Sequence, residues 1–267
     1  MELGKLATEQ ANPLSQAIET LSVAEITQRM NQEDQGVPLA VRQALPEINS
    51  FIEALVPVMA QGGRLFYMGA GTSGRLGLLD ASECPPTFGV SSDRVQGLIA
   101  GGLEAMSQAI EGAEDDQGAA VQDLAALKLS DKDALVGIAA SGRTPYVVAG
   151  LRYAQEQGAL TASLACVEVA EISQWADYPI EVLVGPEIIT GSSRLKAGTA
   201  QKLVLNMIST TAMIQLGKVY QGYMVDVQAT NQKLIDRAHR IIAATADLSL
   251  EQAATYYQAA QGQVKCA

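Results

Sequence analysis

Five short apolar runs, most of them separated by longer stretches with helical periodicity, constrain the fold of this chain more than any other feature. Short apolar strands that alternate with helices are typical of a parallel sheet covered on both faces. The runs lie at residues 65–68, 95–100, 135–139, 161–165 and 180–184. The sequence therefore predicts an α/β fold, a three-layer sandwich around a five-stranded parallel sheet.

Helical patterns precede and follow these runs. Apolar residues at steps of four and three run from Val41 to Met59, which predicts one helix face, and Gly62 and Gly63 end that helix. A shorter helical pattern covers residues 20–31, and a third begins near residue 231. We therefore divide the chain into an N-terminal arm with helices, a central α/β domain and a C-terminal helical segment, at residues 1–60, 61–218 and 219–267.

The composition excludes several classes of protein. Eighteen basic and 29 acidic residues leave a net charge of -11, so nucleic acid is a poor candidate for a partner. His239 is the single histidine, which excludes a His-rich metal site. Cys84, Cys166 and Cys266 form no CxxC pair, so we expect neither a zinc site nor a disulfide framework.

No membrane or export signal stands out in the sequence. The N-terminus lacks an apolar leader, and the most apolar helical stretch, residues 203–216, is interrupted by polar residues. We expect a cytoplasmic protein without a membrane partner.

Three loops rich in glycine and hydroxyl groups follow three of the predicted strands. Their sequences are GAGTSGR at 69–75, ASGRTP at 140–145 and TGSSRLKAGT at 190–199. The carboxyl ends of parallel strands share one edge of a sheet, and helix N-termini there favour anions. These loops predict a phosphate site formed by Gly71, Thr72, Ser73, Ser141, Thr144, Ser192 and Ser193. The alternative is that the hydroxyl groups merely cap helices.

The first loop also matches the GxGxxG pattern of dinucleotide-binding folds. However, the next strand ends in Gly101 and Gly102, where such folds place an acidic residue that binds ribose. A phosphate monoester therefore fits the loop better than a dinucleotide.

Carboxylates must supply the acid–base chemistry, because histidine and cysteine are so scarce. Glu83 stands just before a Pro-Pro break in DASECPP, and Glu114 lies in EGAEDD. Taken alone, either acidic group is more often a solvated face than a functional site.

Long motifs in this chain closely resemble those of N-acetylmuramic acid 6-phosphate etherases. They are MGAGTSGRLGLLDASECPPTFG, IAGG, EGAEDD, GIAASGRTPYV, GSSRLKAGTAQKLVLNM, MVDVQATNQKL and NQEDQGVPLAV. The likeness runs from about residue 17 to about residue 240. It implies the sugar isomerase (SIS) fold for residues 61–218, with a phosphosugar as ligand.

The resemblance also implies a reaction, the cleavage of the C3 lactyl ether of N-acetylmuramic acid 6-phosphate by elimination and then hydration. The products are N-acetylglucosamine 6-phosphate and D-lactate, in amino-sugar and cell-wall recycling. By motif match, Glu83 is the acid that protonates the departing lactate, and Glu114 is the base at C2 or on the incoming water. No metal or other cofactor is implied, and a homodimer is expected by analogy.

Other functions stay open at this point. Family members extend further, through another helical segment, than the GQVKCA at which this chain ends. The chief alternative is a non-catalytic SIS module that binds a phosphosugar and regulates another protein. An aldose–ketose isomerase is a second alternative, because it also removes a proton beside a carbonyl.

Overall fold

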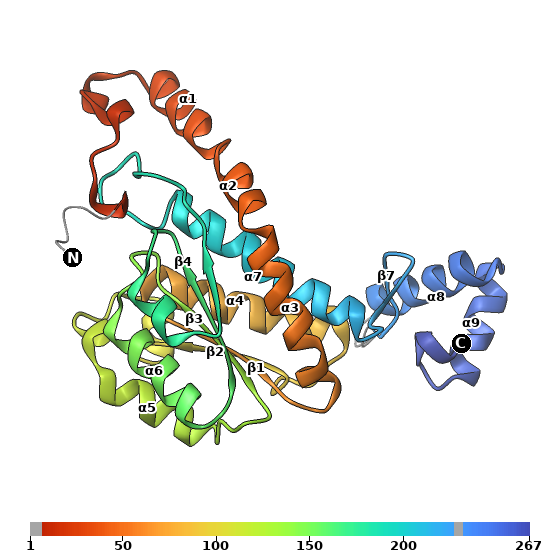
Figure 1. Ribbon diagram of the computed structural model, residues 1–267. Helices are drawn as coiled ribbons and strands as arrows, with labels where there is room; N and C mark the ends of the chain where they lie inside the picture. The colour runs from red at the N-terminus through yellow and green to blue at the C-terminus, as the bar shows by residue number, and fades with distance from the viewer. Residues whose placement is uncertain (1–6, 227–231) are drawn as a thin grey trace.

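The computed structural model describes residues 7–226 and 232–267 (Figure 1). Residues 227–231, which belong to the motif MVDVQATNQKL, lie outside the described part. An N-terminal arm leads into α1 (Val23–Asp34), α2 (Val37–Gln43) and α3 (Leu45–Ala60). In Figure 1, α1 reaches away from the central domain, whereas α2 and α3 lie against α7 (Lys196–Gln215).

The central domain is built on a five-stranded sheet in which all neighbouring strands are parallel. The strand order is β2-β1-β3-β4-β5. The strands are β1 (Leu65–Gly69), β2 (Val95–Ile99), β3 (Ala134–Ile138), β4 (Leu160–Ala165) and β5 (Tyr178–Glu181). All five predicted strands are thus confirmed, with bounds that differ by three residues at most.

Helices cover both faces of the sheet. On one face, α3, α4 (Gly71–Phe88) and α7 (Lys196–Gln215) pack with Tyr67 of β1 in one apolar core. On the other face, α5 (Gln117–Ala126) and α6 (Pro145–Glu156) pack with Phe66 and Met68 of the same strand. Successive side chains of a strand point to opposite faces, so β1 serves both cores. The predicted three-layer sandwich is confirmed.

The single helix predicted from Val41 to Met59 is wrong, because two helices, α2 and α3, meet at Ala44. Pro46 lies in the first turn of α3 and has no N–H to continue the hydrogen bonding of α2. The first helix also begins later than predicted, at Val23, because Ser22 and Glu25 form a capping box at its start.

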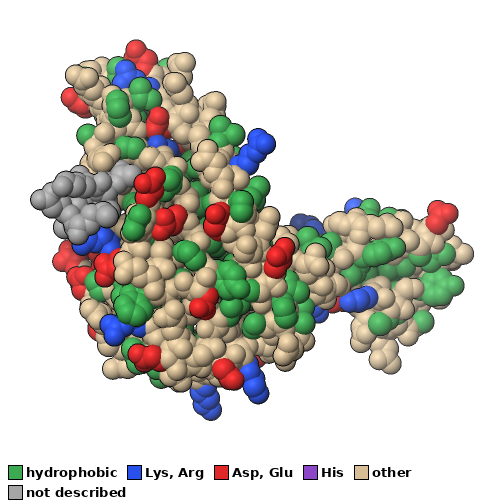
Figure 2. Space-filling view, viewed as in Figure 1, with side chains coloured by type: hydrophobic (Ala, Val, Ile, Leu, Met, Phe, Trp, Pro, Cys, Tyr) green, Lys and Arg blue, Asp and Glu red, His purple; other side chains and the backbone are tan. Residues whose placement is uncertain are grey.

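The C-terminal segment has a small core of its own. It contains the hairpin of β6 (Val219–Tyr220) and β7 (Tyr223–Met224), followed by α8 (Gln232–Ala246) and α9 (Leu250–Ala259). Figure 2 shows this segment as a lobe that projects from the central domain. Within residues 7–226 and 232–267, no helix combines the length and the apolar character needed to cross a membrane.

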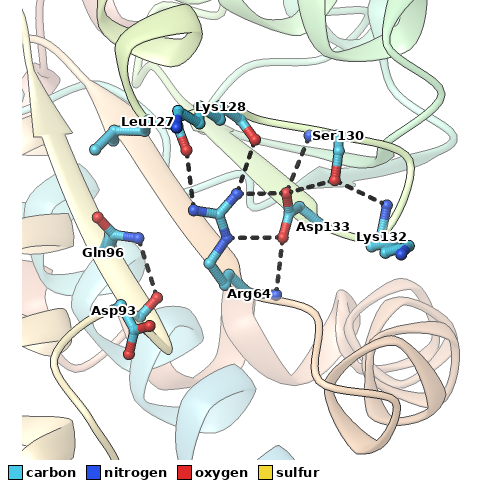
Figure 3. Close-up of polar contacts among 8 residues, drawn as sticks. All are labelled: Arg64, Asp93, Gln96, Leu127, Lys128, Ser130, Lys132 and Asp133. Atoms are coloured by element: carbon cyan, nitrogen blue, oxygen red, sulfur yellow. Dashed lines mark hydrogen bonds and ion pairs between the residues drawn. The ribbon is translucent and has the colours of Figure 1, made fainter.

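The edge of the sheet where the strands begin is held by an ion pair between Arg64 and Asp133 (Figure 3). Arg64 donates from Nε and Nη2 to the two carboxylate oxygens of Asp133, at 3.0 and 2.7 Å. Its guanidinium also donates to the carbonyls of Leu127 and Lys128, just beyond α5. The cluster therefore joins the starts of β1 and β3 to the end of α5.

The carboxylate of Asp133 also accepts hydrogen bonds from the backbone N–H groups of Ser130 and Arg64. Burial raises the pKa of Asp133, but the hydrogen bonds from Arg64 and these backbone groups outweigh burial and place the pKa below its ordinary value. The charged form is thus the one that the fold stabilises.

Replacing Asp133 with Asn should lower the free energy of unfolding by roughly 2–4 kcal/mol, because the guanidinium loses its ionic partner. Urea unfolding followed by circular dichroism at neutral pH measures the change, with exposed Asp131→Asn as the control. The folded pKa of Asp133 is depressed, so its contribution is present above the unfolded pKa and is lost as the pH falls through the folded pKa. The difference between wild type and D133N should therefore narrow below about pH 4. A difference that stays constant into acid would contradict this account.

Candidate functional site

The first hydroxyl-rich loop is positioned by direct contact between α4 and the sheet. A Cβ on Gly74 would lie 2.6 Å from Cγ1 of Ile99 in β2, and one on Gly97 would lie 2.6 Å from the Cα of Leu78 in α4. These glycines let the helix and the sheet approach more closely than any side chain would allow. The first turn of α4 therefore begins at the carboxyl end of β1.

The hydroxyl groups of the first two loops do not cap the helices that follow them. The residue before α4 is Ala70, with no side-chain hydrogen bond to the helix, and Gly71 adopts a positive φ of 52°. Thr144 precedes α6 but makes no capping hydrogen bond with its side chain. The helix-capping alternative is therefore wrong for Thr72 and Thr144, and their hydroxyl groups remain candidates for contact with a ligand.

Ser73 is buried in the first turn of α4 and contacts α7. Its hydroxyl donates a hydrogen bond to Oε1 of Gln201 at 2.9 Å. Ser73 is 7% exposed and Gln201 is fully buried. The hydroxyl proton of Ser73 thus points to α7 and not to the end of the sheet.

The third loop differs from the other two because a carboxylate already occupies the start of its helix. Glu187 is 1% exposed and accepts hydrogen bonds from the backbone N–H groups of Lys196 and Ala197, at 3.0 and 2.9 Å. A carboxylate there satisfies the helix dipole, as a bound phosphate would. Ser192 and Ser193 are half-buried and stay predicted ligand contacts. A phosphate bound by them could not also use the N–H groups of Lys196 and Ala197, because Glu187 already accepts hydrogen bonds from both.

The N-terminal arm is held to the third loop by a second ion pair. Nζ of Lys196 lies 2.6 Å from Oε2 of Glu33 in α1, and the side chain of Asn12 donates to the same oxygen. Burial raises the pKa of Glu33, but the hydrogen bonds from Lys196 and Asn12 outweigh it and lower the pKa below the ordinary value. The arm is therefore attached beside the candidate site by buried and half-buried charges.

Glu114 lies next to the first loop. The short 3-10 helix η6 (Ala113–Asp115) carries it, and its exposed side chain borders a cavity of about 300 Å³ that is also lined by Gly71, Arg75 and Glu111. The structure thus brings together the predicted base and the start of α4.

Arg75 ties the Glu114 segment to α4. The guanidinium of Arg75 donates to the carbonyls of Met106 and Gln108, at 3.2 and 3.3 Å. These carbonyls belong to the segment that leads from β2 to Glu114. Arg75 therefore fixes one wall of the cavity.

The structure does not bring Glu83 to this cavity. The Pro-Pro break predicted after Glu83 is wrong, because α4 continues through Pro85 and Pro86 and ends at Phe88, where Gly89 caps it with a φ of 64°. Glu83 is exposed and stands twelve residues after Gly71 on the same helix. At 1.5 Å per residue, this spacing separates the two residues by about 18 Å along the axis.

A second cavity lies at the ends of β3 and β4. It has a volume of about 370 Å³ and is lined by Ser141, Arg143, Glu171 and Gln174, together with apolar residues. Nη1 of Arg143 is buried and has no hydrogen-bond partner within the described residues. Ser141 thus lies where the sequence predicts, at the carboxyl edge of the sheet, but beside a different cavity from Glu114.

The thiols of Cys84 and Cys166 are both buried. Burial raises the pKa of both Cys84 and Cys166 to about 12. Cys84 lies beside Asp80, whose own pKa is raised by burial against the hydrogen bonds from Asn206 and Ser209. A thiol with so high a pKa is not a nucleophile at neutral pH.

Comparison with protein families agrees with this architecture. The model of the glucokinase regulatory protein N-terminal SIS domain matches residues 47–155, and the SIS domain model matches residues 116–212. Among solved structures, a protein of Escherichia coli CFT073, solved as a complex, has a TM-score of 0.54 at 15% identity, covering 75% of this chain and 96% of its own. A phosphoheptose isomerase from Francisella tularensis has a TM-score of 0.52 at 17% identity, covering 70% and 98%. At these identities the likeness shows the SIS fold alone.

Curated relatives are much more similar. An N-acetylmuramic acid 6-phosphate etherase of Geobacillus sp. (strain WCH70) is 59% identical over 265 residues, which are 99% of this chain and 90% of that protein. The N-acetylmuramic acid 6-phosphate etherase 2 of Lactiplantibacillus plantarum (strain ATCC BAA-793 / NCIMB 8826 / WCFS1) is 57% identical over 267 residues, 100% of this chain and 90% of that protein.

Replacing Arg75 with Gln should loosen the segment that carries Glu114. We expect amide hydrogen exchange over residues 107–114 to become about fivefold faster, since the loss of hydrogen bonds from a charged group costs about 1 kcal/mol at an exposed site. Exchange followed by mass spectrometry measures this, with Arg152→Gln on the exposed face of α6 as the matched control. Equal exchange in R75Q and wild type would show that Arg75 does not hold the segment.

Proposed function

Because the chain belongs to the N-acetylmuramic acid 6-phosphate etherases, we propose that it cleaves the lactyl ether at C3 of N-acetylmuramic acid 6-phosphate, releasing D-lactate and N-acetylglucosamine 6-phosphate. The observation that carries this proposal is identity of 57–59% over nearly the whole chain with relatives of that name. The proposed setting is amino-sugar recycling in the cytoplasm, which suits a phosphorylated substrate.

The chemistry of the proposed reaction needs two acid–base groups beside adjacent carbons. The open-chain aldehyde acidifies the proton at C2, a base removes it, and an acid protonates the lactate oxygen that leaves C3. Water then adds to the unsaturated aldehyde. Glu114, at the cavity beside the start of α4, is the proposed base, and Glu83 is the proposed acid.

Phosphate binding is the proposed role of the open helix starts at α4 and α6. Thr72 and Thr144 keep hydroxyl groups that no cap uses, and the backbone N–H groups of the first turn of α4 add donors. Gly71, Ser73 and Ser141 adjoin the same edge of the sheet. Ser192 and Ser193 are proposed to contact the sugar, because Glu187 already fills the start of α7.

A homodimer is part of the proposal, and the position of Glu83 supports it. Glu83 lies about 18 Å along α4 from the loop that adjoins Glu114, so the two carboxylates of one chain do not reach adjacent carbons of one sugar. A second copy that presents its own Glu83 to the cavity beside Glu114 would complete the site. A symmetric pair then holds two equivalent sites.

The regulatory alternative is not favoured. A glucokinase regulatory protein domain matches residues 47–155 only, whereas the etherases match 99–100% of the chain. The isomerase alternative gains no support from the solved structures, because at 15–17% identity they show the fold alone.

Glu83→Gln should abolish lactate release from N-acetylmuramic acid 6-phosphate while leaving substrate binding within about twofold, since the amide keeps the shape but has no proton to give. A coupled lactate assay measures turnover, and calorimetry measures binding. Glu156→Gln, an exposed site on α6, is the control and should behave as wild type. Turnover by E83Q near the wild-type rate would refute the acid assignment, and an inactive wild-type chain that still binds phosphosugar would favour the regulatory alternative.

Shared sites can be tested by complementation. We expect Glu83→Gln and Glu114→Gln homodimers each to be inactive. A heterodimer of the two, purified through a different affinity tag on each chain, should recover about half of the wild-type rate, because one of its two sites then contains both glutamates. A heterodimer as inactive as its parents would place both glutamates of a site on one chain.

A further inference from the structure

Gln201 carries a buried donor that the fold leaves unused. Its side chain is fully buried on α7, Oε1 accepts the hydroxyl proton of Ser73 at 2.9 Å, and Nε2 has no hydrogen-bond partner within the described residues. Buried amide N–H groups almost always have partners, because leaving one unpaired costs about 1–3 kcal/mol. A function of the Gln201 amide should therefore offset this cost.

A rotation of the amide by 180° gives a second arrangement with the same number of hydrogen bonds. The oxygen and nitrogen of a glutamine amide have nearly the same shape, and a serine hydroxyl can donate or accept. In the rotated form, Nε2 donates to Oγ of Ser73, and Ser73 keeps its own proton to donate elsewhere. The unpaired atom is then a carbonyl oxygen in place of an N–H, and unpaired oxygens are less rare in buried sites.

The freed proton would be well placed to meet an anion. Ser73 is the third residue of α4, and side chains at that position reach back toward the start of the helix. The start of α4 has no side-chain cap and borders the cavity beside Glu114. The neighbouring α7 is packed closely there, since a Cβ on Gly198 would lie 3.3 Å from Cγ2 of Thr72.

We propose that Gln201 is a positioning residue for the phosphosugar, whose amide rotates on binding so that Ser73 donates its hydroxyl proton to the 6-phosphate at the start of α4. This inference rests on the proposed function and deepens it. In the free chain the hydroxyl group of Ser73 donates its hydrogen bond to Oε1 of Gln201. When the phosphosugar binds, the hydroxyl group donates to the phosphate, which is a stronger acceptor. Binding therefore exchanges one buried hydrogen bond for another and adds a charge-assisted one.

Gln201→Glu tests this exchange, because an ionised carboxylate only accepts. The carboxylate at position 201 of this variant would keep accepting the hydrogen bond from Ser73 and could not donate one to Oγ of Ser73. Calorimetry with N-acetylglucosamine 6-phosphate at pH 8 should show a Kd at least about tenfold above that of wild type. As the pH falls, the buried carboxyl becomes neutral and can donate as the amide does, so the ratio of the two Kd values should shrink toward one.

Two further variants separate this role from packing. Gln201→Met keeps the volume and removes both polar atoms, so Kd should rise only about threefold and its ratio to wild type should not change with pH. Gln215→Glu makes the same substitution at an exposed position of α7 and should match wild type throughout. Equal losses in Q201E and Q201M without a pH effect, or no loss in either, would overturn the proposal.

A double-mutant cycle with Ser73→Ala excludes simple charge repulsion. If Gln201 acts through Ser73, the variant S73A/Q201E should bind the phosphosugar as weakly as S73A alone. An additional tenfold loss in the double variant would assign the effect to the new charge and overturn the proposal. A wild-type chain that neither releases lactate nor binds the phosphosugar would instead refute the proposed function itself.

Discussion

The contact of α4 with β1 and β2 is the constraint on which the rest of the site depends. Gly74 and Gly97 remove the side chains that would otherwise hold helix and sheet apart, at points where a Cβ would lie only 2.6 Å from its neighbour. A helix displaced outward by even one side chain would move Ser73 away from Gln201 and would move Arg75 away from the carbonyls of Met106 and Gln108. The glycine-rich motif is therefore a packing requirement as much as a feature of the ligand site.

The three helix starts at the carboxyl edge of the sheet are treated differently by the fold. The start of α7 holds the internal carboxylate of Glu187, whereas the starts of α4 and α6 have no side-chain cap. A helix start that is already neutralised stabilises the structure but has little left to offer an anion. The starts of α4 and α6 are thus the ones left open to an anion, which is why the proposed phosphate site uses them and not the start of α7.

The sequence was informative wherever the signal was local. Apolar runs predict all five strands because a parallel strand buried on both faces must be apolar along its length. The hydroxyl-rich loops are also recognisable from the sequence, because each is a short run of neighbouring residues. By contrast, Gln201 and Glu187 became candidates only with the structure, since their partners lie on other elements of the fold. The Pro-Pro pair was misleading because α4 continues through it, although each proline lacks the N–H that would bond to the carbonyl four residues earlier.

The position of Glu83 shows why motion within one chain does not bring it to Glu114. Glu83 and Gly71 belong to the same continuous helix, so the distance between them is fixed by the helical rise. Glu114 is carried by a separate segment, but Arg75 attaches that segment to the first turn of α4. Bringing Glu114 to Glu83 would mean breaking this attachment and moving the segment along about three turns of helix. In the proposed dimer, a second copy of the chain presents its own Glu83 without disturbing either element, which is why the catalytic proposal and the dimer proposal depend on each other.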